Sequence, residues 1–173
     1  EGIDPASVNV VPRTSFGVEQ LTSGQVDGLV GWIINEGITL REAAYDPVVL
    51  LMNNYRVATY DFVIFTAEDF ATQHPQQVKA FLQALRAGLE DVIANPAQAV
   101  TDLLEVNPAL DPVAQERRLV ATLPLMTVPD QSPLSMDYRV WEFTHQTLLN
   151  QGLLETPLDV YFVYTLDFLT ADS

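Results

Sequence analysis

The sequence of 173 residues contains no cysteine. This absence excludes disulfide bonds, thiolate catalysis, cysteine-ligated zinc and cysteine-ligated iron–sulfur clusters. Basic residues are also scarce, because 8 Lys and Arg stand against 23 Asp and Glu and give a net charge of −15. Such an acidic excess argues against nucleic acid, or an anionic membrane surface, as a partner. No apolar run approaches the roughly 20 residues that a membrane helix needs.

The common catalytic and metal-binding motifs are missing as well. The sequence has no G-x-S-x-G, no Walker loop, no H-E-x-x-H and no calcium-loop spacing. Glu142 and His145 have the Glu-x-x-His spacing of a di-metal bundle, but that site needs the motif twice and the chain has only two histidines. The sequence therefore predicts no catalytic residue, no metal site and no cofactor.

The residues that are present suit a packed globular domain, with 48% hydrophobic and 18% charged. Short runs rich in apolar and β-branched residues predict strands at Val8–Val11, Val26–Ile34, Val48–Met52 and Phe62–Thr66. The last two runs are apolar on both faces, which is typical of strands in a buried parallel or mixed sheet. We therefore expect an α/β protein with helices on both faces of such a sheet.

Helical patterns dominate the rest of the chain. The clearest is a stripe of apolar residues that recurs with helical period from Val78 to Ile93. Further helices are predicted at Phe16–Thr22, Asn35–Ala44, Pro96–Glu105, Val113–Leu123 and Ser135–Asn150, with a loop from Pro124 to Pro133. Four strands are few for so many helices. Either the chain is a fragment or a partner supplies strands, and self-association is then expected.

Several short motifs, taken in order, resemble one family. They are Gly2-Ile3-Asp4-Pro5, Leu21-Thr22-Ser23-Gly24-Gln25-Val26-Asp27-Gly28, Trp32-Ile33-Ile34-Asn35-Glu36-Gly37, Tyr60-Asp61, His74-Pro75-Gln76-Gln77-Val78-Lys79-Ala80-Phe81, Gly88-Leu89-Glu90 and Asn95-Pro96-Ala97-Gln98-Ala99. Together they resemble ABC-importer substrate-binding proteins of the nitrate, sulfonate and taurine class. The resemblance is sharpest to the branch that binds the pyrimidine precursor of thiamine, whose relatives include riboflavin-binding components.

The resemblance implies a two-lobed fold like that of type II periplasmic binding proteins, with this chain as its C-terminal part. Residues 1–50 would complete the second lobe and the hinge crossing, and residues 51–173 would return to the first lobe. The implied function is the solute-binding component of an ABC importer. It would be periplasmic or extracellular, or lipid-anchored in the full-length protein, and would partner the transporter permease.

Two alternatives belong to other classes of protein. One is an enzyme of the same fold that synthesises the pyrimidine, but that family relies on a histidine and on a cysteine-rich iron-binding motif. The absence of cysteine counts heavily against it. The other is a ligand-sensing lobe of a receptor, whose partners would be further protein domains.

The main candidate ligand-binding residues, Trp32, Asn35 and Glu36, directly follow an apolar run. Trp32 offers a flat face for stacking an aromatic ring. Asn35 offers donors and an acceptor to a heterocycle, and Glu36 can accept from an exocyclic amine. The alternative is that Trp32 belongs to the core while Asn35 and Glu36 cap the following helix.

A second cluster consists of Tyr60 and Asp61. Tyr60 is expected to close a stacking sandwich with Trp32, and Asp61 to accept a hydrogen bond; the alternative is an ordinary turn with an exposed aromatic. Ser15, at a predicted helix start, can present N–H groups to a phosphate or carboxylate, joined by Arg13 if the ligand is phosphorylated. As a plain N-cap, Ser15 needs no function.

Overall fold

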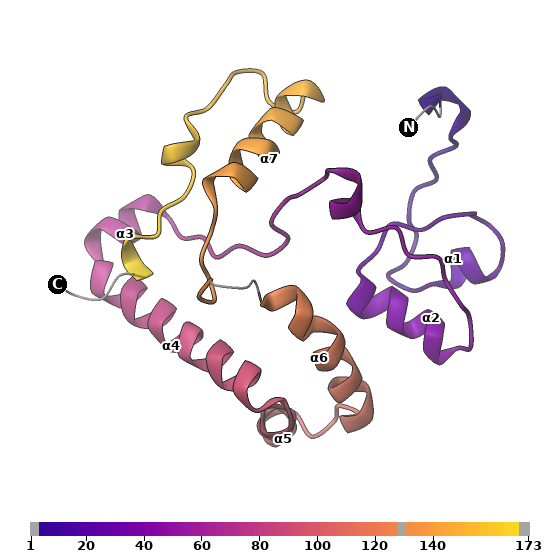
Figure 1. The fold of residues 1–173 in the computed structure, drawn as a ribbon, viewed down its shortest axis with the longest axis horizontal. Helices are drawn as coiled ribbons and strands as arrows, with labels where there is room; N and C mark the ends of the chain where they lie inside the picture. The colour runs from indigo at the N-terminus through magenta and orange to yellow at the C-terminus, as the bar shows by residue number, and fades with distance from the viewer. Residues whose placement is uncertain (1–3, 128–130, 170–173) are drawn as a thin grey trace. The chain divides into compact units, whose positions relative to one another are not determined.

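The protein is described by a computed structural model that covers residues 4–127 and 131–169 (Figure 1). The chain forms two compact units, Glu1–Val49 and Leu50–Ser173. We use these two units to describe the fold. The assignment of residues 1–50 and 51–173 to two lobes of a larger fold stays a prediction.

The first unit is built from short turns of helix joined by extended chain. Its elements are a 3-10 turn at Pro5–Ser7, α1 at Glu19–Thr22, a π-helical turn at Ile33–Gly37 and α2 at Ile38–Glu42. Val18, Ile38 and Leu40 are the buried apolar residues described in this unit. Gly24 has a φ of +73°, a conformation that glycine adopts at little cost, and it follows the C-terminal end of α1.

The second unit is a series of helices. It contains α3 (Glu68–Gln73), α4 (Pro75–Ala94), α5 (Pro96–Val106), α6 (Pro112–Met126) and α7 (Tyr138–Asn150). Three 3-10 turns lie at Met52–Tyr55, Val160–Phe162 and Asp167–Leu169. Successive helices from α3 to α6 contact one another, and α4 also contacts the turn at Asp167–Leu169 (Figure 1). Arg86 of α4 donates a hydrogen bond to the carbonyl oxygen of Leu169 over 3.2 Å.

Local sequence signals explain where these helices begin. Each of α4, α5 and α6 starts with proline, whose fixed φ and missing N–H suit the first helical position. The side chains of Asn95 and Asp111 cap α5 and α6 by accepting from the N–H groups of Gln98 (3.3 Å) and Ala114 (2.7 Å).

Asp137 caps α7 through the backbone N–H of Arg139, at 2.8 Å. Hydrogen bonds from the Arg139 guanidinium, followed by the one from its backbone N–H, lower the pKa of Asp137 to about 2. The cap therefore stays ionised throughout the ordinary pH range.

The predicted sheet is wrong for this chain. The structure contains helices, turns and extended segments in residues 4–127 and 131–169. It forms no β-strand within these residues. The four runs predicted as strands lie largely in extended or irregular backbone, and Val48, Phe62 and Phe65 expose 84–91% of their surface. A strand needs a neighbouring backbone to satisfy its N–H and C=O groups. Apolar composition favours extended chain, but it does not provide that neighbour.

The helix predictions fare better. The stripe from Val78 to Ile93 lies within α4, and the helix predicted at Pro96–Glu105 is α5. By contrast, α1 is only four residues long and is preceded by Val18, so the helix start predicted at Phe16, with Ser15 as its N-cap, is wrong. The loop predicted from Pro124 also begins too early, because α6 continues to Met126.

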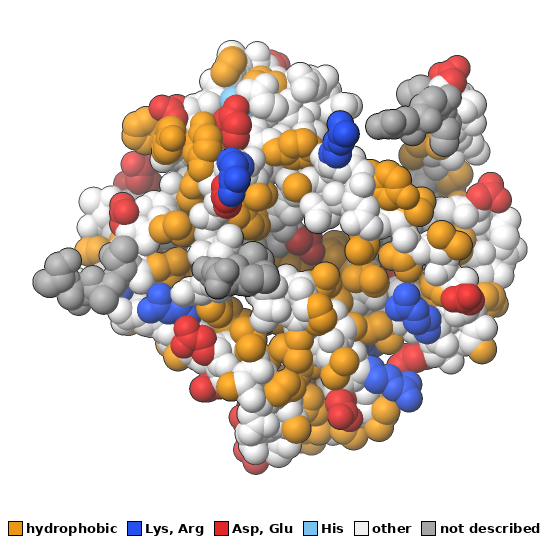
Figure 2. All heavy atoms as spheres, in the orientation of Figure 1, with side chains coloured by type: hydrophobic (Ala, Val, Ile, Leu, Met, Phe, Trp, Pro, Cys, Tyr) orange, Lys and Arg blue, Asp and Glu red, His pale blue; other side chains and the backbone are white. Residues whose placement is uncertain are grey.

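Apolar side chains remain widely exposed. Figure 2 shows hydrophobic atoms across the visible face of the molecule. Among the described residues the buried apolar set consists of Val18, Ile38, Leu40, Val100 and Val160, which expose 3–9% of their surface. Helix faces that carry large apolar residues are therefore only partly covered.

Candidate functional site

Arg13 is the centre of a hydrogen-bond network that joins two loops of the first unit. Its Nε donates to the carbonyl oxygen of Ser15 at 2.7 Å, and its Nη1 donates to that of Val30 at 3.1 Å. Its Nη2 donates to the carbonyl oxygen of Gly17 at 3.3 Å and to Oε1 of Glu36 at 2.5 Å. One planar guanidinium thus fixes the loop around residues 13–17 against the segment at 30–36.

Glu36 is the buried partner of Arg13, with 7% of its surface exposed. Its second oxygen, Oε2, accepts from the backbone N–H of Trp32 at 2.8 Å. Burial raises the pKa of this carboxyl, but the hydrogen bonds from Arg13 and Trp32 outweigh that effect, so the pKa lies below its usual value. Both oxygens are thus occupied within the protein, and direct contact between Glu36 and a ligand stays a prediction.

The predicted residues Trp32 and Asn35 lie at the π-helical turn that carries Glu36. Trp32 exposes 41% of its surface, so it is not a core residue of its unit. Asn35 is exposed, and its backbone N–H donates to the carbonyl oxygen of Trp32 at 3.0 Å. The structure therefore brings Trp32, Asn35 and Glu36 together, with an indole accessible for stacking.

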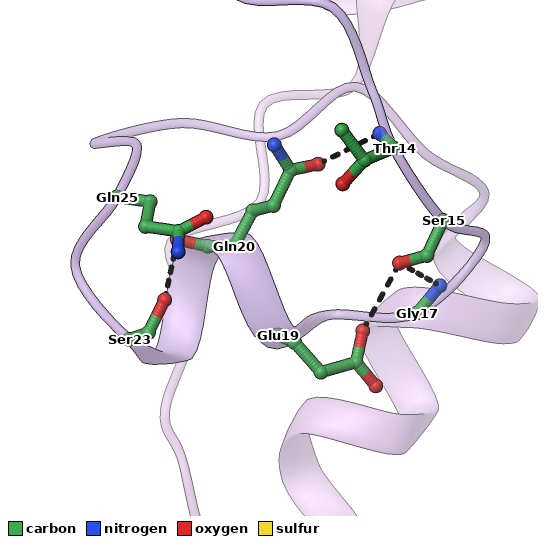
Figure 3. Close-up of a pocket in the computed structure, with 7 residues that line it drawn as sticks. All are labelled: Thr14, Ser15, Gly17, Glu19, Gln20, Ser23 and Gln25. Carbon is green, nitrogen blue, oxygen red and sulfur yellow. Dashed lines mark hydrogen bonds between the residues drawn. The ribbon is translucent and has the colours of Figure 1, made fainter.

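Next to this network lies a hollow of about 520 Å³, shown in Figure 3. Its lining is Thr14, Ser15, Gly17, Glu19, Gln20, Ser23 and Gln25. Its volume lies within the range of small-molecule sites, about 300–1,000 Å³. Ser15 and Gly17, whose carbonyl oxygens accept from Arg13, are members of this lining.

Internal hydrogen bonds hold the walls of the hollow (Figure 3). The Ser15 hydroxyl donates to Glu19 at 3.2 Å and accepts from the N–H of Gly17 at 3.3 Å. The side-chain oxygen of Gln20 accepts from the N–H of Thr14 at 3.2 Å. After Gly24 the chain turns back, so that the N–H of Gln25 donates to the carbonyl oxygen of Gln20 at 2.9 Å. Ser15 thus shapes the hollow as a loop residue, not as the first residue of a helix.

The second predicted cluster belongs to the other unit and has its own partners. The Tyr60 ring lies 5.7 Å from Trp141, and the Tyr60 hydroxyl accepts from the N–H of Asp137 at 2.6 Å. Trp141 in turn stacks on Tyr164 with ring centroids 5.4 Å apart. Asp61 is exposed beside Tyr60. Since Trp32 and Tyr60 belong to different units, the sandwich between them stays a prediction.

Glu142 and His145 of α7 form a local pair. Nδ1 of His145 lies 3.7 Å from a Glu142 oxygen, and Nε2 accepts from the backbone N–H of Leu158 at 3.0 Å. His145 thereby ties α7 to the chain that follows it. In residues 4–127 and 131–169 no group of three or more His, Cys, Asp or Glu side chains is arranged to hold a metal ion.

Comparison with known proteins identifies the family. The family described as NMT1/THI5 like matches residues 1–99. The chain belongs to this family. That range contains all six predicted ligand-binding residues and the whole lining of the hollow.

A relative within the curated proteins extends the likeness beyond the range of the NMT1/THI5-like match. Riboflavin-binding protein RibY of Chloroflexus aurantiacus is 26% identical over 179 residues, which cover 99% of this chain and 50% of RibY. The chain thus spans about half the length of this relative. No solved structure matches. The predicted resemblance to this substrate-binding superfamily is confirmed, and the two matches support a role in solute binding.

Six of the seven lining residues were not predicted as site residues: Thr14, Gly17, Glu19, Gln20, Ser23 and Gln25. Three of them lie in or beside the motif Leu21 to Gly28, which carries part of the resemblance to the NMT1/THI5-like family. The sequence signal that could have indicated these residues is the group of polar side chains on both sides of Gly24. Among the described residues, no helix is both long and apolar enough to span a membrane.

Proposed function

We propose that this chain is part of the solute-binding component of an ABC importer and binds a flat, nitrogen-bearing heterocycle. Riboflavin is the leading ligand, and a pyrimidine precursor of thiamine is the second. The proposal places the protein in the periplasm or outside the cell, beside its transporter permease. The observation that carries it is the match of 99% of this chain to a riboflavin-binding relative.

The first unit supports this proposal through its accessible aromatic rings. Trp32 is 41% exposed and Phe16 is 88% exposed. The backbone of Trp32 is held by Glu36, and the Phe16 ring lies 5.6 Å from the guanidinium carbon of Arg13. The same ion pair therefore supports both rings, and a flat heterocycle gains favourable stacking from such faces.

Titration calorimetry with riboflavin, an aminopyrimidine, taurine and nitrate tests the ligand class. We expect heat of binding with a heterocycle and none with the two small anions. Calorimetry is preferable to tryptophan fluorescence, because Trp141 contacts Tyr60 and Tyr164 and contributes its own signal. Tight binding of taurine or nitrate, without a response to either heterocycle, would refute the proposal.

The role of Trp32 is tested by Trp32→Ala. Loss of a stacking face together with its buried area is worth about 1.5 kcal/mol or more, which corresponds to at least about a tenfold weaker affinity. Tyr45→Ala is the matched control, because Tyr45 is an exposed aromatic residue of the same unit, 49% accessible. Equal affinities of both variants and the unmodified chain would remove Trp32 from the site.

A further inference from the structure

The lining of the hollow has a distinct chemical character. Thr14, Ser15 and Ser23 carry hydroxyl groups, and Gln20 and Gln25 carry amides. Groups of both kinds donate and accept hydrogen bonds. Glu19 adds one carboxylate, and none of the seven lining residues is basic. Such a surface matches hydroxyl groups better than it matches an anion.

Arg13, the cation of the adjoining loop, already uses four of its five N–H donors within the protein. Its guanidinium donates to three carbonyl oxygens and to the carboxylate of Glu36. A phosphate that took the Nη2 donor of Arg13 would displace Glu36, a buried carboxylate that would then lose its charged partner. The charge of Arg13 is therefore balanced by Glu36 within the protein, which argues against a phosphate at the predicted anion site of Arg13 and Ser15.

The hollow and the accessible aromatic rings are connected by this same network. Arg13 bonds to the carbonyl oxygens of Ser15 and Gly17 on the lining side and to Glu36 on the other, and Glu36 holds the backbone of Trp32. Phe16 lies between the two lining residues in sequence. A ligand with a flat ring and a hydroxylated chain has a matching surface for each part.

We propose that the hollow receives the uncharged, hydroxylated portion of the ligand, such as a ribityl chain, and selects against its phosphate ester. This inference rests on the proposed function and names the ligand class for the same region. The Thr14 hydroxyl and the Gln25 amide bind the chain, and Glu19 accepts from a ligand hydroxyl. The same carboxylate repels a phosphate, which adds to the repulsion from a molecule of net charge −15.

Calorimetry with three flavins tests the inference on the full chain. Riboflavin carries the ribityl chain, FMN carries its phosphate ester, and lumiflavin has the same ring system without the chain. We expect riboflavin to bind about tenfold more tightly than either of the others, because hydrogen bonds to the chain are lost in lumiflavin and repulsion opposes FMN. The ratio of the riboflavin affinity to the FMN affinity should decrease at high salt, since screening weakens the repulsion between the protein and the phosphate.

Two variants distinguish the effect of the Glu19 charge in the hollow from the effect of the net charge of the whole molecule, and a third tests the Gln25 amide. Glu19→Gln should improve FMN affinity about threefold to fivefold relative to riboflavin. Glu105→Gln removes the same charge at an exposed position of α5 and should leave the ratio nearly unchanged. Gln25→Ala should weaken riboflavin about threefold and leave lumiflavin unchanged, because only riboflavin reaches the amide.

The outcomes distinguish this inference from the proposed function. Equal affinities for the three flavins, or a preference for FMN, would overturn the inference and leave heterocycle binding intact. Binding of the aminopyrimidine alone would do the same. An absence of binding for every heterocycle would overturn both. If Glu19→Gln does not fold, as judged by circular dichroism, the salt dependence and Gln25→Ala still decide the question.

Discussion

At the scale of single residues, Glu36 has the most constrained environment in the first unit. It is the one buried charged residue among those described, and its two oxygens accept from Arg13 and from Trp32. A buried carboxylate is stable only when hydrogen bonds and an opposite charge replace water. The ion pair therefore acts as the crosslink that shapes both the aromatic surface and the edge of the hollow.

Glu36→Gln should destabilise the chain by about 2 kcal/mol at pH 7, because it removes one member of a partly buried ion pair. The pKa of Glu36 is lowered in the folded state, so its contribution is present above the unfolded value near 4.5. That contribution is lost as pH falls through the folded pKa. Urea unfolding of both proteins, followed by circular dichroism, should show the difference shrinking below about pH 4.

Asp46→Asn is the control for that experiment, since Asp46 is an exposed acid in the same unit. It removes an equal charge and should change the free energy of unfolding by less than about 0.5 kcal/mol. A difference between Glu36→Gln and the unmodified chain that is constant from pH 7 to pH 3 would contradict the proposed role of the ionised pair.

Gly31 and Gly28 form a matched pair for a packing test. A Cβ at Gly31 would lie 2.9 Å from Cδ and Oε2 of Glu36, whereas one at Gly28 meets nothing within 4 Å. Glu36 cannot yield cheaply, because both of its oxygens are bonded. Gly31→Ala should therefore cost about 1–2 kcal/mol in the free energy of unfolding, and Gly28→Ala should be neutral or slightly stabilising. Equal effects in denaturant titration would show that the Glu36 side chain moves freely.

At the scale of elements, the helices whose signals are local are the ones that sequence reasoning finds. The apolar stripe of α4 and the proline that begins α5 are both read directly from the chain. The prediction that the helix ends before Pro124 is wrong because Pro124 lies in the last turn of α6. There the loss of one backbone hydrogen bond does not end the helix. The predicted strands fail for a different reason, because strand formation requires a partner that local sequence does not reveal.

Tyr60 links an extended segment to the start of α7, and it offers a test at this scale. Its hydroxyl accepts from the N–H of Asp137, the N-cap residue of that helix. Tyr60→Phe keeps the ring beside Trp141 but leaves this partly buried N–H unpaired, so we expect a loss of about 1 kcal/mol in thermal or urea unfolding. Tyr55→Phe, at a tyrosine that is 62% exposed, is the control.

The same variant also addresses the predicted role of Tyr60 in ligand stacking. The phenylalanine ring retains a stacking face, so heterocycle affinity should change little even if Tyr60 contacts the ligand. Tyr60→Leu removes that face. Weaker binding by Tyr60→Leu, with Tyr60→Phe unaffected in both stability and affinity, would favour a ligand role over the hydrogen bond to Asp137.

At the scale of the whole molecule, the exposed apolar residues predict self-association. Phe62 and Phe65 expose 84% and 91% of their surface in an extended segment with unpaired backbone. Such segments are prone to pair with another chain. Sedimentation velocity should show mass increasing with concentration, and the double change Phe62→Ser and Phe65→Ser should raise the monomer fraction.

Phe162→Ser is the control for location, because Phe162 is 89% exposed in a different segment. It should leave the association largely unchanged if the contact runs through Phe62 and Phe65. A single monomeric species over a wide concentration range, together with one two-state melting transition, would count against self-association.

The sequence by itself determined the acidic charge, which follows from composition, and the family, which follows from short motifs in a fixed order. It also determined the approximate positions of the long helices, which follow from local periodicity. It also indicated Trp32, Asn35 and Glu36 as a group, because a single turn contains them. Only the tertiary structure decided that Arg13 pairs with Glu36, 23 residues away, and that Tyr60 bonds to Asp137, 77 residues away. Those contacts depend on how loops fold back on one another. The same long-range geometry makes Glu36 the ion-pair partner that holds the backbone of Trp32, while its contact with a ligand stays a prediction.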